Sequence, residues 1–404
     1  MLLKYTRTLA VRGVGSFLSV FALYFVTNSF GVELSSAFLF GISLLGWLVV
    51  LSSSGFGIFI LKNCSEITYN KESELSTSTL FSALAYTVLV SFFIVIPISI
   101  SFLFFLKYEN IINLLPYLIS LPFVNSVILV SFFFQAKSRN EMSAFLQNII
   151  LWFVFILSFS SSCYVGIFIC SVDYLPYIYL FSSFLSAVFS FSFLFYVYDF
   201  SSFSFLKFDG YFDTWIYQVL MSFVSLGGIV LSKSYLDDYD FSLLGLSARL
   251  SFSINILVVI ANSVISPIFS RAFTDNLSLS TLYRQTHRYM LFVSLSLLIF
   301  LILSSDFLMV LFGDGYSNSG YLLLTLSIPH LVNLSCGPIY PLLNMTNKNL
   351  ILRNTNLLIF FLFVMFFVLF AHMASVTWFA VSISVMISLQ SLIPYFYCRF
   401  KKLI

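Results

Sequence analysis

The sequence predicts an all-α polytopic membrane protein with twelve transmembrane helices in two parallel six-helix lobes. Three observations predict this class: 60% of the 404 residues are hydrophobic, 9% are charged, and apolar runs of membrane-spanning length recur along the chain. A soluble domain carries roughly 25% charged residues, and one that exposed so many Phe, Leu and Ile side chains would precipitate. Lipid is therefore the expected solvent.

Each expected helix is an apolar run of roughly 20 residues, which at 1.5 Å per residue covers about 30 Å of hydrocarbon. The first half of the chain contains six such runs, at 9–30, 36–61, 79–106, 114–134, 145–170 and 175–198. The second half contains six more, at 215–231, 241–269, 289–304, 321–343, 356–372 and 376–397. No small-residue cleavage site follows the first run, so we interpret it as a helix that is retained and not as a signal peptide.

The basic residues are distributed unevenly over the connections between these runs. Of the 19 Lys and Arg residues, sixteen fall on one side of the membrane, Lys107 and Lys233 fall on the other, and Arg249 lies inside a run. Because cytoplasmic loops are enriched in Lys and Arg, this bias places both termini in the cytoplasm. The basic residues form no patch, so nucleic acid is not an expected partner.

The two halves resemble each other at a constant offset of 209 residues. The matched positions are Lys62 with Arg271, Gln135 with Asn344, and Arg139-Asn140 with Lys348-Asn349. Polar residues after a helix are common, so chance agreement is the alternative to duplication. Six is an even number of helices, so duplication predicts two copies related by an axis along the membrane normal. We expect an N-terminal lobe at 1–200, a cytoplasmic linker at 201–214 and a C-terminal lobe at 215–404.

Patterns typical of catalysis are absent from the sequence. No His and Cys cluster has metal-ligand spacing, no glycine-rich phosphate loop is present, and the carboxylates fall in loops or at helix ends. We therefore expect no enzyme activity, no catalytic or metal-binding residue and no cofactor, while coupling to a proton or sodium gradient is left open. The 5 cysteines indicate no disulfide framework.

Arg249 is the strongest candidate for a binding residue. It lies about eight residues into its run, or roughly 12 Å from the membrane boundary at 1.5 Å per residue. An Arg at the membrane centre costs about 2.5 to 3.5 kcal/mol on insertion scales, a cost that is tolerated beside a hydrated cavity or an anion. A guanidinium can bind a phosphate group with paired hydrogen bonds. The alternative is a snorkelling or carbonyl-bonded Arg that joins two helices.

Five further residues are candidate substrate contacts in a cavity. Arg12 is either a positive-inside anchor or a cytoplasmic gate for an anionic head group. His330 and Asn333 share a helix face, and helix-to-helix hydrogen bonds explain them as well as substrate contacts do. The same two interpretations apply to Asn255 and Asn125.

Four local patterns carry a resemblance to a known family. They are Ser-Gly-Phe-Gly-Ile-Phe-Ile-Leu-Lys at 54–62, Phe-Phe-Gln-Ala-Lys at 133–137, Ala-Arg-Leu with Ser-Pro-Ile-Phe-Ser-Arg at 248–250 and 266–271, and Leu-Phe-Gly-Asp-Gly-Tyr at 311–316. With these patterns the full-length chain resembles bacterial polysaccharide flippases of the O-antigen (Wzx) type. They belong to the MOP superfamily, which also holds the MATE-like multidrug exporters and the lipid II flippases.

The resemblance implies a V-shaped pair of lobes with a central hydrated cavity and alternating access. The implied substrate is an undecaprenyl-pyrophosphate-linked oligosaccharide, carried from the cytoplasmic to the periplasmic leaflet of the bacterial inner membrane. Membrane lipids and other polysaccharide assembly proteins are the implied partners. The chain departs from lipid II flippases in having few cavity arginines and only twelve spans, which argues against peptidoglycan precursor transport.

Two alternatives belong to other functional classes. A membrane O-antigen polymerase is equally hydrophobic but typically needs a large periplasmic loop, whereas the longest such segment here is 305–320. A cation-coupled multidrug exporter is expected to keep an Asp or Glu within its helical bundle, and this sequence places none there.

Overall fold

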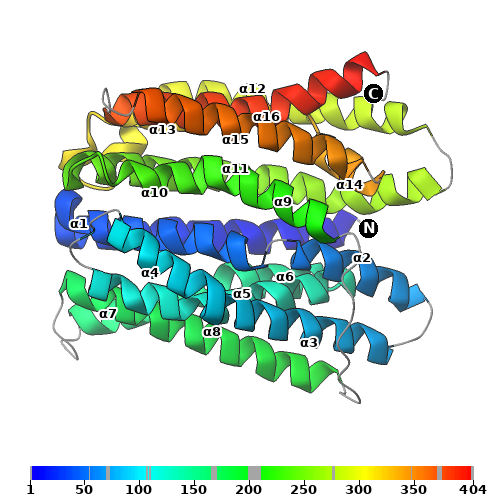
Figure 1. Ribbon diagram of the computed structural model, residues 1–404, viewed down its shortest axis with the longest axis horizontal. Coiled ribbons are helices and arrows are strands. Elements are labelled where there is room, and N and C mark those ends of the chain that lie inside the picture. The colour runs from blue at the N-terminus through cyan, green and yellow to red at the C-terminus, as the bar shows by residue number, and fades with distance from the viewer. Residues whose placement is uncertain are drawn as a thin grey trace. The chain divides into compact units, whose positions relative to one another are not determined.

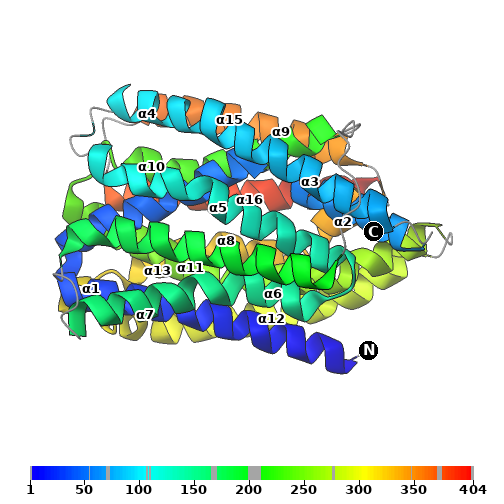
Figure 2. The ribbon, with the colours of Figure 1, turned by 90° about the horizontal axis from the view of Figure 1, so that it is seen from below.

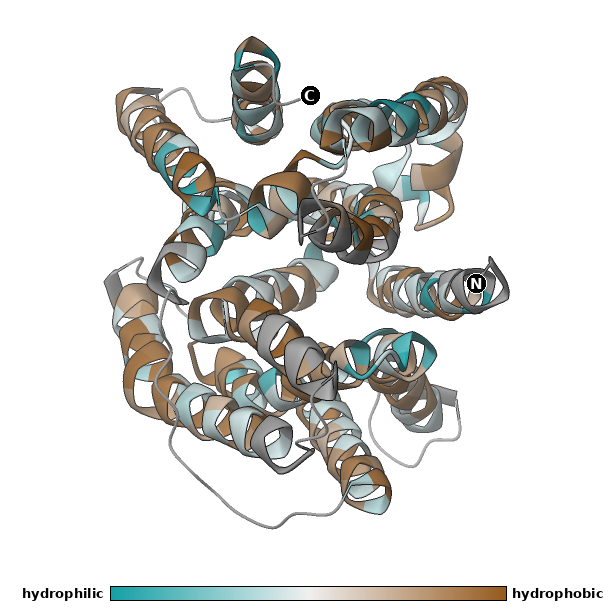
Figure 3. Ribbon diagram, turned by 90° about the vertical axis from the view of Figure 1, so that its right-hand side faces the viewer, coloured by the Kyte–Doolittle hydropathy of each residue, from teal (hydrophilic) through white to brown (hydrophobic). Residues whose placement is uncertain are grey.

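The computed structural model describes residues 2–53, 55–69, 73–105, 108, 111–164, 171–198, 211–274, 278–346, 348–370 and 375–401. These residues form helices and turns, and none of them is in a strand. Apolar residues predominate along the ribbon, with scattered polar segments (Figure 3). The predicted all-α class is confirmed.

Ten helices of the described part are long and apolar enough to cross a membrane, and a bent pair makes up to eleven. The first, Ala10–Ser53, has 44 residues, about 66 Å at 1.5 Å per residue, twice the thickness of the hydrocarbon. It contains Gly31 at φ 77° and ψ −176°, where two helical segments meet at a kink. Figure 1 shows the N-terminal helix, in blue, turning back on itself. Divided at Gly31, this segment supplies two spans, and the described residues accommodate the twelve predicted ones.

The elements follow one another along the chain with few interruptions. In the first half they are α1 (Leu2–Ser53), α2 (Phe56–Tyr69), α3 (Ser73–Val90), η1 (Ser91–Val95), α4 (Ile96–Phe105), α5 (Ile111–Ala136), α6 (Asn140–Phe145), η2 (Leu146–Ile150), α7 (Leu151–Tyr164), η3 (Val172–Tyr174) and α8 (Leu175–Val197). In the second half they are α9 (Tyr211–Ser222), η4 (Phe223–Gly227), α10 (Gly228–Ser232), α11 (Asp238–Thr274), α12 (Leu279–Val310), η5 (Asp314–Tyr316), α13 (Gly320–Ser335), α14 (Ile339–Met345), α15 (Asn349–Phe370) and α16 (Val376–Phe400).

The chain divides into two compact units. Unit 1 comprises Met1–Ala22 and Gly41–Gln218, and unit 2 comprises Leu23–Phe40 and Val219–Ile404. The turn at Gly31 and a short helical segment on each side of it therefore belong to unit 2. The rest of α1 belongs to unit 1. The linker predicted at 201–214 lies largely outside the described residues.

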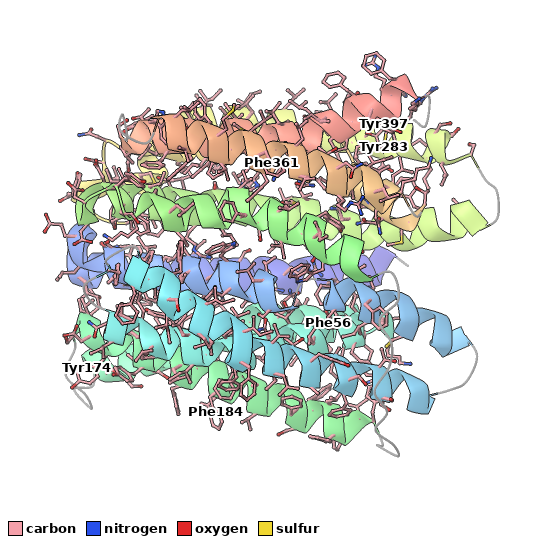
Figure 4. All side chains as sticks on the ribbon, viewed as in Figure 1. Phe56, Tyr174, Phe184, Tyr283, Phe361 and Tyr397 are labelled. Carbon is pink, nitrogen blue, oxygen red and sulfur yellow. The ribbon has the colours of Figure 1, made fainter. Side chains whose placement is uncertain are left out.

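In unit 1, α5 and α8 pack closely along a row of serines. Ser182, Ser186 and Ser190 are buried on one face of α8, and each hydroxyl donates to the carbonyl four residues earlier, at 2.7, 2.7 and 2.8 Å. Small side chains whose hydroxyls are satisfied within their own helix let two backbones approach. Phe184 lies on the outer side of the same helix (Figure 4). The sequence of α8 thus separates a small packing face from a large apolar face.

The span predicted at 36–61 is broken. α1 ends at Ser53 and α2 begins at Phe56, with Gly55 at φ 84° between them. Gln218 of α9 accepts a hydrogen bond from the Gly55 amide at 3.0 Å, and the Trp215 indole donates to the Leu51 carbonyl at 3.3 Å. Unpaired backbone groups are costly at membrane depth, so these two side chains make the break tolerable.

The span predicted at 321–343 is also bent, by 51° between α13 and α14.

Prolines leave two further backbone carbonyls without their helical hydrogen bond. Pro329 has no amide hydrogen to donate to the Thr325 carbonyl, and Pro394 has none to donate to the Gln390 carbonyl. Each freed carbonyl accepts from a hydroxyl of the neighbouring element: Ser384 Oγ donates to Thr325 at 2.8 Å, and Tyr340 Oη donates to Gln390 at 3.0 Å. α13, α14 and α16 are therefore joined at their prolines.

The offset of 209 residues reappears in the structure. α5 begins at Ile111 and α6 begins at Asn140, while α13 begins at Gly320 and α15 begins at Asn349. The turn between them repeats as well, because the amides of Arg139 and Lys348 each donate to the carbonyl five residues earlier at 2.9 Å. The match supports internal duplication, but it is incomplete, since α11 is continuous where α1 and α2 are broken.

Candidate functional site

Arg12 occupies a buried position on the N-terminal part of α1. Thr8, Arg12 and Gly15 form one buried face of this helix, and the Arg12 side chain is only 4% exposed. Gly15 lies against Asn148 of η2, where an added Cβ would stand 2.4 Å from the Asn148 Cβ. Arg12 forms no hydrogen bond or ion pair with the residues that the structure describes, and its Nε is enclosed. A full positive charge is thus buried without a described counterion.

The helix beside Arg12 carries a second polar group that lacks a described partner. α6, η2 and α7 run alongside the N-terminal part of α1 and in the same direction (Figure 2). Five residues before Asn148 lies Ser143, which is 1% exposed and whose hydroxyl has no hydrogen-bond partner among the described residues. Arg12 lies three residues before Gly15, so Arg12 and Ser143 differ in depth by about 3 Å at 1.5 Å per residue. Both can donate to an anion.

In unit 2, four of the predicted contacts lie on two packed helices, which we call the α11–α13 cluster: Arg249, Asn255, His330 and Asn333. Arg249 is half-buried and follows the start of α11, Asp238, by eleven residues, about 17 Å at 1.5 Å per residue. α11 thus begins three residues before the predicted 241, and Arg249 lies within its third to fourth turn.

His330 fixes the register between the two helices of the cluster. Its ring, 6% exposed, meets Phe252 edge to face at 5.3 Å between centroids. Asn255 follows Phe252 by three residues and Asn333 follows His330 by three. α11 and α13 run in the same direction (Figure 1), so both amides lie one turn beyond this contact, and Arg249 lies one turn before it on α11. The structure thus places His330 against the helix that carries Arg249 and Asn255.

Asn125 has a different environment, in the interior of unit 1. Its side chain is 0% exposed, and its amide donates to Ser52 Oγ at 2.7 Å and to Ser91 Oγ at 3.2 Å. Both serine hydroxyls already donate to backbone carbonyls, so they accept from Asn125, and this fixes the orientation of its amide. Asn125 therefore joins α1, α5 and η1, and the structure shows its role in packing. Its use as a substrate contact stays a prediction.

Acidic side chains are absent from the buried part of the described structure. Among the buried polar side chains there, Arg12 carries a full charge and none is a carboxylate. The ion pair found among the described residues, Lys233 with Asp238, lies at the start of α11. No described group of three His, Cys, Asp or Glu residues could hold a metal ion. The buried side chains of the described residues thus include a formal positive charge and no carboxylate.

Two features were missed in the sequence. The break at Gly55 was not predicted, because the apolar run continues through it and a lone Gly is tolerated in a helix. Cys163 is disulfide-bonded, with its partner outside the described residues, so the expectation that no disulfide follows was wrong. Its position within an apolar run concealed it, because cysteine spacing alone does not distinguish buried thiols from a disulfide.

No family model and no curated protein matches the chain in sequence. Solved structures do match, each over 98% of the chain. They include an inward-facing multidrug resistance MATE family transporter of the MOP superfamily, with TM-score 0.64, 13% identity and 98% of that chain covered. A Vibrio cholerae MATE transporter gives TM-score 0.68, 13% identity and 97% coverage. A MOP superfamily transporter from Pyrococcus furiosus, described as having a binding pocket of reverse polarity that suggests a different function, gives 0.65, 14% and 95%. The chain has the fold of these transporters.

Proposed function

We propose that this protein is a membrane transporter that moves an undecaprenyl-pyrophosphate-linked oligosaccharide from the cytoplasmic to the periplasmic leaflet. The observation that carries the proposal is Arg12, a guanidinium buried in a candidate span without a described partner. A charged side chain costs about 2.5 to 3.5 kcal/mol at the centre of a span, and less toward its end, where Arg12 lies two residues after Ala10. A substrate that brings two phosphates into the membrane compensates this cost.

The chemistry of the arginine side chain fits a pyrophosphate. Its planar guanidinium forms paired hydrogen bonds to phosphate oxygens and keeps its charge at every physiological pH. Ser143, at a similar depth, adds a neutral donor. In unit 2 the α11–α13 cluster offers a second guanidinium with two amides and an imidazole, groups that suit a phosphate and the hydroxyl or acetamido groups of sugars.

The fold by itself is compatible with a cation-coupled multidrug exporter as well, since one of the similar structures is a multidrug resistance transporter. The sign of the charge inside the helical bundle distinguishes the two functions. A cationic drug needs an acidic group in the bundle, whereas the described buried side chains include Arg12 and no carboxylate. The Pyrococcus furiosus transporter supports a change of function by reversed pocket polarity within this fold. The similarity to transporters also disfavours the polymerase alternative.

We further propose the bacterial inner membrane as the location, with both termini in the cytoplasm. The positive-inside bias supports this orientation. The disulfide of Cys163 agrees with it, because Cys163 lies at the end of α7 that the bias places outside the cytoplasm, where disulfides persist.

Binding of undecaprenyl pyrophosphate to purified protein tests the proposal directly. Arg12→Ala should weaken binding at least about tenfold, the effect of losing one charge-assisted hydrogen bond, and Arg12→Lys should weaken it less. Arg7→Ala is the matched control, because Arg7 is exposed on the same helix. Surface polysaccharide in cells should fall in the same order. Equal binding by all variants, or polymer formation by the purified protein, would overturn the proposal.

A further inference from the structure

Residues 23–40, which we call the strap, belong to unit 2, although both flanking segments of α1 belong to unit 1. The chain therefore passes from one unit to the other at Ala22 and again at Phe40. If the two units move relative to each other, the strap either travels with unit 2 and bends α1 at both points, or separates from unit 2. The contacts of the strap decide between these outcomes.

One contact is an ionic group at the start of α11. Ser36 Oγ donates to Asp238 Oδ1 at 2.7 Å and accepts from Lys233 Nζ at 2.9 Å, while Lys233 and Asp238 form an ion pair. Lys233 Nζ also lies 5.0 Å from the ring centre of Phe241. The Asp238 side chain is 65% exposed, so water can replace these bonds. Solvent-exposed ionic hydrogen bonds contribute roughly 0 to 1 kcal/mol each, so they stabilise the position of the strap only weakly.

The second contact is the turn at 311–316, the Leu-Phe-Gly-Asp-Gly-Tyr pattern to which the proposed function gives no role. Asn28 Nδ2 donates to the Leu311 carbonyl at 3.2 Å. Tyr24 meets Phe312 edge to face at 6.3 Å. Gly313 has φ 125°, a conformation that favours glycine, and it directs the turn toward the strap.

The end of this turn encloses the tip of the strap. A Cβ added at Gly315 would stand 2.4 Å from Val32 Cγ2, so only glycine allows this approach. The buried Tyr316 hydroxyl shares hydrogen bonds with Ser242 of α11, at 2.7 Å, and with Ser35 of the strap. Burial raises the pKa of Tyr316 to about 12, so its hydroxyl remains a donor at physiological pH.

We propose that the strap is a releasable clasp, held to unit 2 by Lys233, Asp238 and the 311–316 turn, and that it must leave these contacts in each transport cycle. The proposal rests on the proposed transport function. The polar contacts are directional and the Asp238 side chain is exposed, while Phe38, Leu39 and Phe40 of the strap are buried and Phe40 meets Phe241 edge to face at 5.8 Å. Both flanking segments of α1 belong to unit 1.

A distance measurement that needs no substrate tests the clasp. Spin labels at Glu33→Cys and Asp314→Cys, both exposed positions, report the separation of strap and turn in lipid vesicles. The cysteines Cys64, Cys336 and Cys398 are buried and should not be labelled. We expect a short and a long distance. Asp238→Asn should raise the ratio of long to short about tenfold, as for the loss of one charge-assisted hydrogen bond.

Asp237→Asn is the matched control, because it removes a neighbouring charge that caps Asp240 and does not touch the strap. It should leave the distance ratio unchanged. A single short distance in the labelled parent and in the Asp238→Asn variant would overturn the proposal. So would an equal shift with Asp237→Asn.

A disulfide lock tests the need for release. The Cβ positions of Gly315 and Val32 are 3.6 Å apart, within the range for a disulfide. The Val32→Cys/Gly315→Cys protein should cross-link, stop supporting surface polysaccharide when oxidised, and recover with reductant. Val32→Ser/Gly315→Ser and the wild type receive the same treatments, which controls for reduction at Cys163.

The outcomes separate the two proposals. Failure to cross-link, or full function of the cross-linked protein, overturns the clasp. If the wild type moves no lipid-linked sugar at all, the proposed function fails, while the distance measurement still decides whether the strap is released.

Discussion

Arg12 and Arg249 show how differently two arginines in candidate spans are accommodated. Arg12 is almost fully enclosed and has no described partner, whereas Arg249 is half-buried on a helix that packs against His330 and its neighbours. The sequence identified both charges, because a basic residue in an apolar run is conspicuous. It ranked Arg249 first, because Arg249 lies further inside its run, whereas the structure buries Arg12 more deeply. Burial depends on which face of a helix meets which neighbour, and the sequence does not show this.

Arg249 provides the first prediction at this scale. Arg249→Lys keeps the charge and loses the planar fork, so it should retain part of the transport, and Arg249→Ala should lose most of it. Removing a charge from a span takes away an unfavourable transfer energy, so amounts in the membrane should stay near wild type. Surface polysaccharide and membrane abundance measure the two effects. Full polysaccharide with the Ala variant, or its loss from the membrane, would favour a purely structural role.

Ser138 provides a prediction about stability. It lies in the turn after α5 with φ 60°, a left-handed conformation that a side chain disfavours, while the Arg139 amide closes the turn onto the Phe134 carbonyl. Ser138→Gly should therefore stabilise the protein by about 1 kcal/mol, seen as a higher thermal midpoint in detergent. Ser192→Gly, at an exposed position inside α8, is the control and should destabilise by about 0.5 kcal/mol. A lower midpoint for Ser138→Gly contradicts the argument.

At the scale of elements, sequence patterning located the spans but not their breaks. A hydropathy profile predicts a helix wherever apolar residues continue for the length of a span. It does not detect a single glycine with positive φ, such as Gly55. It also started helix α12 late, at 289 where α12 begins at Leu279, because Arg284 and Arg288 lower the mean hydropathy of turns that are nonetheless helical. The partners that stabilise the break, Trp215 and Gln218, lie far away in sequence and required the fold.

The proline-freed carbonyls give a prediction for α13 and α16. Ser384→Ala removes the donor to the Thr325 carbonyl and should cost about 1 to 3 kcal/mol, the penalty for an unsatisfied buried group. Pro329→Ala restores an amide that can donate to the same carbonyl within α13. In the Pro329→Ala background, Ser384→Ala should therefore cost much less. Thermal midpoints of the four proteins give the coupling, and additive effects would show that the hydroxyl does not serve this carbonyl.

At the scale of the whole chain, the 209-residue offset was readable from the sequence because it survives in the polar turns Lys137 to Asn140 and Thr346 to Asn349. The helix starts of α5 and α13 and of α6 and α15 repeat at this offset. The assignment of residues 23–40 to unit 2 was not readable, because it follows from side-chain contacts at 233–242 and 311–316 and not from hydropathy.

The orientation of the whole molecule gives the last prediction. If sixteen basic residues mark the cytoplasmic side, Ser278 and Lys401 face the cytoplasm, and Asp173 and Asp314 face outward. All four are exposed, so burial cannot explain a difference between them. A membrane-impermeant thiol reagent on intact cells should label Asp173→Cys and Asp314→Cys but not Ser278→Cys or Lys401→Cys, and lysed cells should be labelled at all four. The free native cysteines are buried and should give little background. Labelling of Ser278→Cys in intact cells would reverse the orientation and would place the disulfide of Cys163 in the reducing compartment, where disulfides are rare.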